Sequence, residues 1–173
     1  MTMNIIETDF QGLYLIEYHS LIDDRGIFMK PWVKTELEPI FGDNIETYFS
    51  SSKEGTLRGL HYQVGEYAQD KFVVCLQGII EDIAIDLRKE SSTYGNTFRA
   101  TLKPGSHGLI IPKGFAHGIY AKSDCLITNF CSNPYNSESE KGINWSSIQD
   151  LQDLKVSFLS DKDKNLPRLE EIL

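Results

Sequence analysis

The stretch F-V-V-C-L-Q-G-I-I-E-D-I-A-I-D-L, residues 72–87, carries a clear β-strand pattern. Its first half is a short apolar run closed by Gln77-Gly78, as expected of a buried strand that ends in a turn. Its second half alternates, with Ile83, Ile85 and Leu87 on one face and Asp82, Ala84 and Asp86 on the other. The stretch therefore predicts two consecutive β-strands.

Strand patterns of the same kind cover much of the chain on both sides of this stretch. Glycine, proline, serine and aspartate turns separate segments 12–18, 27–29, 56–62, 98–102, 108–112, 116–121 and 125–130. Lys122-Ser123-Asp124 turns the chain back, so that the last two segments are expected to form a hairpin. Short strands with such turns predict a mainly β fold, an antiparallel β-barrel or jelly roll with a few short helices.

Three segments depart from the strand pattern. Residues 21–26 are expected to form a loop, and residues 33–41 a short helix cut by Pro39. Residues 132–173 are polar and irregular, with one helical turn near residues 146–151. We expect this last segment to pack over the barrel, because it has no low-complexity character.

Composition sets limits on the protein's class and partners. The 173 residues, 40% of them hydrophobic, predict a single domain over residues 1–173. The net charge of -8 argues against general binding to nucleic acid or to a membrane surface, but a few cations in a cleft can still hold an anionic ligand. Three cysteines without metal-type spacing, no secretory leader and no apolar run of about 20 residues predict a cytoplasmic protein with free thiols.

The stretch T-L-R-G-L-H-Y-Q-V-G-E-Y-A-Q-D-K, residues 56–71, carries the candidate chemistry. On a regular strand Arg58 and Leu60 would share one face and His61 the other, unless Gly59 marks a bulge. The position two residues after His61 is glutamine, so the close histidine pair of a cupin-type metal centre is missing, and we expect no metal.

No serine-nucleophile elbow or glycine-rich phosphate loop occurs either, so acid–base chemistry remains. A histidine in a barrel can accept a proton near neutral pH, and a nearby lysine can stabilise the oxyanion that forms. His61 and Lys71 therefore fit proton abstraction next to a carbonyl. A buried structural histidine and a solvated lysine are the alternatives.

Eight motifs resemble the dTDP-4-dehydrorhamnose 3,5-epimerase family, which comprises small cupin-fold enzymes that act on nucleotide-linked 4-keto sugars. They occur in order over most of the chain, which makes the resemblance far more specific than any one motif. The motifs are D-D-R-G-I-F (23–28), L-R-G-L-H-Y-Q (57–63), A-Q-D-K (68–71), D-L-R (86–88), S-S-T-Y-G (91–95), I-P-K-G-F-A-H-G (111–118), G-I-N-W (142–145) and L-S-D-K-D (159–163).

The resemblance implies a homodimer, to which the N-terminal strands contribute, with neither metal nor organic cofactor. It implies that His61 is the base and that Asp163, rather than its neighbour Asp161, orients this histidine. It also places Arg58, Lys71, His117 and Tyr135 near the substrate, with Arg25 reaching the diphosphate from the partner subunit.

The chain departs from the family pattern at four positions. Asn129 stands where the family has its tyrosine acid, and an amide cannot give up a proton in this role. We expect Asn129 to lie opposite His117, with water, Tyr135 or Tyr120 replacing the tyrosine or only one carbon inverted. Lys30 replaces an acidic residue, and Glu46 and Tyr48 replace the Gln-x-Asn that helps to read thymine, although dTDP remains the expected nucleotide.

Three functions fit these residues. The first is epimerisation of a nucleotide-linked 4-keto-6-deoxy sugar at C3, C5 or both, in the synthesis of deoxysugars for surface polysaccharides such as lipopolysaccharide. The second is a 3,4-ketoisomerase of the same sugars, whose family usually carries a close histidine pair that this chain lacks. The third is a non-catalytic cupin that only binds the nucleotide sugar.

Overall fold

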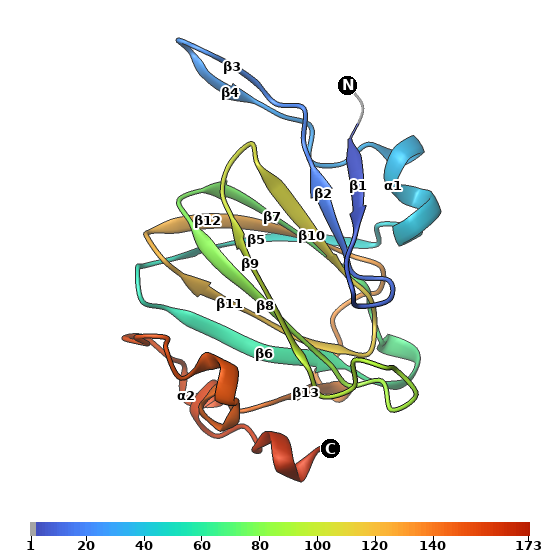
Figure 1. Ribbon diagram of the computed structural model, residues 1–173, viewed down its shortest axis with the longest axis vertical. Helices are drawn as coiled ribbons and strands as arrows, with labels where there is room; N and C mark the ends of the chain where they lie inside the picture. Colours follow the sequence, from blue (N-terminus) through green and yellow to red (C-terminus); the bar gives the residue numbers. More distant parts are fainter. Residues whose placement is uncertain (1–2) are drawn as a thin grey trace.

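The computed structural model describes residues 3–173 as two antiparallel sheets packed face to face, with a separate two-stranded hairpin (Figure 1). The strands of the six-stranded sheet are, in spatial order, β1 (Asn4–Glu7), β2 (Tyr14–Glu17), β10 (His107–Ile111), β7 (Lys71–Gln77), β12 (Cys125–Cys131) and β5 (Glu46–Ser52). Those of the five-stranded sheet are β13 (Glu140–Gly142), β6 (Leu57–Gln63), β11 (Phe115–Ala121), β8 (Ile80–Asp86) and β9 (Thr97–Leu102).

Helices are short and few in the described chain. Two are α-helices, α1 (Lys34–Phe41) and α2 (Asp161–Lys164), and four are 3-10 turns, η1 (Gly65–Tyr67), η2 (Trp145–Ser147), η3 (Gln149–Leu151) and η4 (Leu169–Glu171). The mainly β prediction is therefore confirmed, as a jelly-roll sandwich rather than a closed barrel. None of the helices in residues 3–173 has the length and apolar character needed to cross a membrane.

The stretch at residues 72–87 forms the centre of both sheets. It folds into β7 and β8, which belong to different sheets and are joined at Gln77-Gly78. Val73 and Ala84 pack between the sheets, whereas Ile83 and Ile85 pack on the outer side of the five-stranded sheet. The predicted alternation is confirmed, and burial on both faces explains why the whole stretch is so apolar.

Each sheet has an outer layer that buries its second face. Over the five-stranded sheet, the C-terminal segment contributes Ile143, Ile148, Leu151 and Leu154 to a cluster with Leu60. Over the six-stranded sheet, Leu37 and Phe41 of α1 pack with residues that include Phe72, Phe130 and Trp32. The inner faces of the two sheets are thus left to form the central core and the site.

Three local predictions are wrong, and one helix was missed. Residues 21–26 are not a loop but part of a hairpin, β3 (Leu21–Asp23) and β4 (Gly26–Phe28), which projects from the sandwich (Figure 1). Pro39 does not end α1, which continues to Phe41 and is closed by Gly42. Strands β11 and β12 do not form a hairpin, because the turn at residues 122–124 carries the chain from one sheet to the other. The missed helix is α2.

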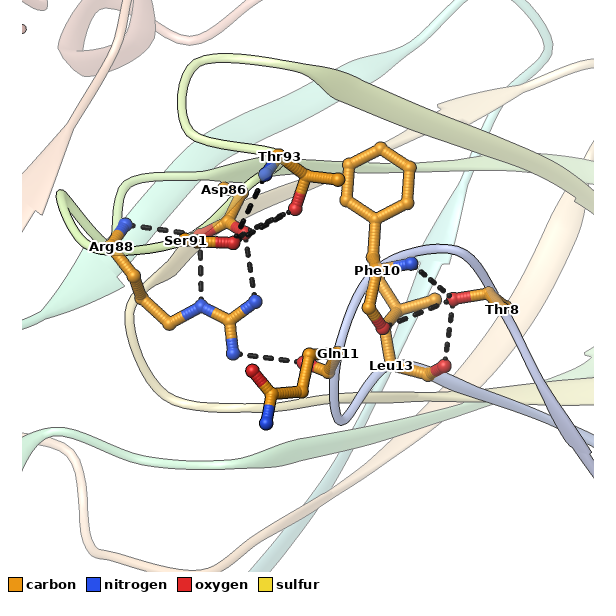
Figure 2. Close-up of polar contacts among 8 residues, drawn as sticks. All are labelled: Thr8, Phe10, Gln11, Leu13, Asp86, Arg88, Ser91 and Thr93. Carbon is orange, nitrogen blue, oxygen red and sulfur yellow. Dashed lines mark hydrogen bonds and ion pairs between the residues drawn. The ribbon is translucent and has the colours of Figure 1, made fainter.

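A buried carboxylate fixes the end of β8 (Figure 2). Asp86 accepts hydrogen bonds from the side chains of Arg88, Ser91 and Thr93, and Arg88 also donates to the backbone oxygen of Gln11 at 2.8 Å. Burial alone would raise the pKa of Asp86, but these hydrogen bonds outweigh it and hold the pKa well below its ordinary range. The loop after β8 is therefore anchored to the core and to the N-terminal turn.

Candidate active site

The predicted chemistry lies in a cavity of about 1390 Å³ between the two sheets. The five-stranded sheet contributes Arg58, His61 and His117, and the six-stranded sheet contributes Tyr48, Lys71 and Asn129. A smaller cavity of about 500 Å³ shares Tyr48, His61 and Lys71 and is also lined by Glu46, Tyr135 and Glu140. Most of the residues singled out from the sequence are therefore brought together.

A bulge in β6 places two of these residues on one face. The segment from Arg58 to His61 lies opposite only His117 to Ile119 of β11, so β6 carries one extra residue. Gly59 occupies the bulge with φ of +116°, and a Cβ there would lie 2.7 Å from the Cα of Gly118. Regular alternation, which would separate Arg58 from His61, was wrong, and the alternative of a bulge at Gly59 is confirmed.

His61 is held by a carboxylate from a distant part of the chain. Its Nε2 lies 2.6 Å from Oδ1 of Asp163, which is buried on the one-turn helix α2. Ser160 caps this helix by accepting a hydrogen bond from the Asp163 backbone N–H, whereas the side chain of Asp161 is 93% exposed. The structure thus places Asp163, and not Asp161, against His61.

This contact fixes which nitrogen of His61 is free. A carboxylate only accepts, so Nε2 carries the proton and Nδ1 is left as a proton acceptor. Burial would raise the pKa of Asp163, but the hydrogen bond and charge of His61 outweigh burial and lower it. The carboxylate therefore stays ionised, oriented toward the imidazole.

A second carboxylate, which sequence reasoning missed, lies on the other side of the imidazole. Oε1 of Glu140 is 4.0 Å from Nδ1 of His61, and Glu140 also accepts hydrogen bonds from Tyr135 and Lys162. Two negative charges around one imidazole favour the imidazolium that proton abstraction would produce. Nothing in the short strand β13 marks Glu140 in the sequence, because its position depends on pairing with Gln63 of β6.

His117 also has a carboxylate partner. Its Nε2 lies 2.9 Å from Oδ1 of Asp82, and both side chains are buried. The other oxygen of Asp82 has no hydrogen-bond partner within the described structure. The alternation in residues 72–87 placed Asp82 on one face with Ala84 and Asp86, but gave no reason to pair it with His117.

On the wall formed by the six-stranded sheet, the polar side chains lack the carboxylate partners that His61 and His117 have. Lys71 has neither a side-chain hydrogen bond nor an ion pair among residues 3–173, and burial lowers its pKa, partly offset by nearby acidic groups. Asn129 is buried, and its side-chain oxygen has no partner in the same part of the chain. Asn129 lies across the cavity from His117 on the opposing sheet, not beside it in a hairpin as predicted.

Two of the predicted site residues, Arg25 and Lys30, line neither cavity of the single chain. Arg25 lies on the β3–β4 hairpin with its side chain 91% exposed, paired with Asp23. Lys30 is also exposed and lines neither cavity. Glu46 and Tyr135 do line the smaller cavity, where Glu46 accepts a hydrogen bond from the backbone N–H of Tyr135.

Of the three cysteines, Cys125 lines the larger cavity. In the part of the chain that the structure describes, no group of three or more histidine, cysteine, aspartate or glutamate side chains is placed to hold a metal ion. Cys75, Cys125 and Cys131 are buried free thiols, as the spacing predicted.

Comparison with known proteins identifies the class. The family model described as dTDP-4-dehydrorhamnose 3,5-epimerase matches residues 7–171. The enzyme of that name from Escherichia coli (strain K12) is 36% identical, over 99% of this chain and 97% of its own length. The one from Methanothermobacter thermautotrophicus is 37% identical, over 96% and 94%.

Solved structures agree with these relatives. The dTDP-4-dehydrorhamnose 3,5-epimerase from Sulfolobus tokodaii superposes with a TM-score of 0.91 at 34% identity, covering 100% of this chain and 98% of that one. A dTDP-6-deoxy-D-glucose-3,5-epimerase from Legionella pneumophila, solved in complex with dTDP-4-keto-L-rhamnose, gives 0.90 at 34% identity and covers 99% and 95%.

These matches define a sugar epimerase, an enzyme of the isomerase class, on a jelly-roll fold. The chain belongs to the dTDP-4-dehydrorhamnose 3,5-epimerase family. Of the three functions that the sequence allowed, the ketoisomerase and the non-catalytic cupin are therefore not supported.

Proposed function

We propose that the protein epimerises a dTDP-linked 4-keto-6-deoxy sugar at C3, C5 or both, by removing a proton next to the C4 ketone. The observation that carries the proposal is the His61–Asp163 pair facing Lys71 across one cavity. The complex of the Legionella pneumophila relative with dTDP-4-keto-L-rhamnose supports the choice of nucleotide and sugar.

In this mechanism Nδ1 of His61 takes the proton, and Asp163 and Glu140 stabilise the imidazolium that results. The electron pair of the broken C–H bond moves toward the C4 oxygen. Lys71 lies on the opposing sheet and places its ammonium group near the developing enolate. Because Lys71 is desolvated and has no protein carboxylate as a partner among the described residues, its charge is available to the substrate.

The diphosphate would be held by cations at the cavity. Arg58 is fixed there by hydrogen bonds to the Ser52 hydroxyl and the Ser51 backbone oxygen, at 2.8 and 2.9 Å. His117 lines the same cavity. Glu46 and Tyr135 line the smaller cavity and would contact the nucleotide there.

We also propose that the protein acts as a homodimer in the cytoplasm. The β3–β4 hairpin projects from the sandwich with Leu21, Ile22, Ile27 and Phe28 exposed, as expected of an arm that packs on another subunit (Figure 1). Such an arm would bring Arg25 to the partner's cavity, as the family resemblance implies, and Lys30 lies just beyond it. The product would supply a deoxysugar for surface polysaccharide.

Solvent deuterium exchange tests the function. The protein is incubated in D₂O with a dTDP-4-keto-6-deoxy sugar, and NMR follows uptake at C3 and C5. Uptake at both carbons supports double epimerisation and uptake at one carbon supports single epimerisation, whereas no uptake at either would refute the proposal.

The His61→Ala variant tests the base. Its exchange should fall by at least about 10²-fold, since general base catalysis is worth about 10²–10⁴. The matched control is His19→Ala, because His19 is exposed and lines neither cavity. Full exchange in the His61 variant would contradict its role.

A further inference from the structure

Inversion of a carbon needs a second acid–base group on the face opposite His61. After the base removes a proton from one face, a donor must deliver a proton to the other. Asn129 occupies the inner face of the six-stranded sheet, opposite the sheet that carries His61, but an amide does not donate a proton to carbon. Water or another group on that wall must therefore supply the proton.

Two tyrosines that could replace Asn129 are excluded by their contacts. The hydroxyl of Tyr120 donates to the backbone oxygen of Lys155, and Tyr120 lines neither cavity. The hydroxyl of Tyr135 donates to Glu140 at 2.9 Å, and Glu140 is the carboxylate next to Nδ1 of His61. Tyr135 is thus tied to the base side of the cavity, from which a proton would only return to the face it left.

Tyr48 is a proton-carrying group on the wall opposite His61. On β5 it is the direct cross-strand partner of Asn129, so the two side chains lie on one face with Cβ atoms about 5 Å apart. It lines both cavities together with His61 and Lys71, and no hydrogen bond of its hydroxyl is formed within residues 3–173. Positions 48 and 129 are also two of those at which the chain departs from the family pattern, with the tyrosine now on the neighbouring strand.

We propose that Tyr48 is the proton donor opposite His61, a catalytic residue rather than a contact to the base of the nucleotide. This inference rests on the epimerase function proposed above. His61 and Tyr48 belong to different sheets, so a sugar ring bound between the sheets has one of them on each face. The tyrosine that the family pattern has at position 129 of β12 is thus replaced by Tyr48, at the paired position on β5.

Tyr48 carries its proton at neutral pH. Although Tyr48 is 42% exposed, partial burial raises its pKa, with Cys131, Glu46 and Glu140 adding to the effect. A raised pKa makes the phenol a weaker acid, so donation depends on stabilising the tyrosinate. The charge of Arg58 acts in the opposite direction and would stabilise the tyrosinate while it exists.

The proton transfers balance without a further reactant. His61 breaks the C–H bond and becomes imidazolium, and the electron pair forms the enolate at the C4 oxygen. The enolate carbon then takes the proton of the Tyr48 hydroxyl on its other face, which restores the ketone and leaves tyrosinate. Proton exchange with water returns both side chains to their starting states.

The test separates exchange from inversion in Tyr48→Phe. We expect the variant to keep deuterium uptake that depends on His61, because the imidazolium can return solvent deuterium to the original face. Inversion of the exchanging carbon, followed by NMR of the product configuration, should fall by at least about 100-fold. Tyr120→Phe is the matched control and should invert at the rate of the unaltered protein.

Rescue provides the second arm. Adding Asn129→Tyr to Tyr48→Phe should restore inversion at least tenfold, because a phenol returns to the same face from the adjacent strand. Undiminished inversion in Tyr48→Phe would overturn the proposal, and so would loss of exchange together with inversion, which would indicate a role in binding. Neither of these two results with the variant would contradict the proposed function. That proposal fails only if the unaltered protein shows no exchange.

Discussion

The two walls of the cavity differ in how their polar side chains are held. On the five-stranded wall His61 and His117 are each bound to a buried carboxylate, and Arg58 is fixed by Ser51 and Ser52. On the six-stranded wall Tyr48, Lys71 and Asn129 make no side-chain hydrogen bonds within the described chain. The protein therefore orients these side chains of one wall through its own contacts and leaves the three on the other wall to the substrate.

This difference has a physical reason. A base must keep one tautomer and one orientation before the substrate arrives, which needs carboxylates that are part of the fold. Groups that stabilise the enolate or deliver a proton act on the substrate itself, so a protein partner would compete with it. Unpaired buried groups lower the stability of the fold, and active sites are where such groups are expected.

Of the variants that compare the two walls, Asp163→Asn should lose the most activity, because it breaks the contact that orients His61. The amide can donate to His61 and stabilise the tautomer with the proton on Nδ1, which blocks the acceptor. Exchange should fall by about 10²–10³-fold, while dTDP still binds, since Asp163 is tied to His61 and to α2. NMR exchange and calorimetric titration with dTDP measure the two effects. An exchange rate within threefold of that of the unaltered protein would show that His61 on the five-stranded wall does not need the Asp163 carboxylate.

A smaller loss is expected from Lys71→Met, which removes the unpaired cation. Exchange should fall by about 10²-fold, as for loss of one group that stabilises an oxyanion. Stability should not fall, because the ammonium is desolvated and pairs with no carboxylate among residues 3–173. Urea unfolding checks this second expectation. A variant that loses stability but keeps its exchange rate would place Lys71 with the structural residues instead.

Asp86→Asn should have the smallest effect on activity, because this carboxylate has its partners outside the cavity (Figure 2). Its depressed pKa contributes stability that is present above the ordinary value near 4 and is lost as the pH falls through the folded value. The variant should be less stable at pH 7 by about 1–3 kcal/mol.

The pH dependence supplies the control for this variant. The difference in unfolding free energy between Asp86→Asn and the unaltered protein should shrink in urea titrations below pH 4. A difference that stays constant down to pH 2 would contradict the assignment, and so would a large loss of exchange at pH 7.

The sequence predicted the core better than the connections between its parts. Burial on both faces is encoded locally in residues 72–87, so β7 and β8 were found. The sequence of the turn at residues 122–124 is compatible both with a hairpin and with a crossing between sheets. Only the packing of the two sheets puts β11 and β12 in different ones. The hairpin at Leu21 was missed because its exposed residues lack a buried face.

The site shows the same limit. Gly59 marked a possible bulge, and the bulge explains why Arg58 and His61 share a face. The contact between His61 and Asp163 joins residues 102 positions apart, so it was expected from family resemblance and not from spacing. Glu140 and Asp82 were missed because their roles depend on strand register, and Tyr48 gained its role only once it was paired with Asn129.

A crystal structure with a bound dTDP-4-keto-6-deoxy sugar would show whether His61 and Tyr48 act on opposite faces of the sugar ring. It should show the sugar ring between the sheets, with Nδ1 of His61 facing the exchanging carbon on one side and the Tyr48 hydroxyl on the other. A ring with both side chains on the same face, or a ring bound outside the cavity, would contradict the account.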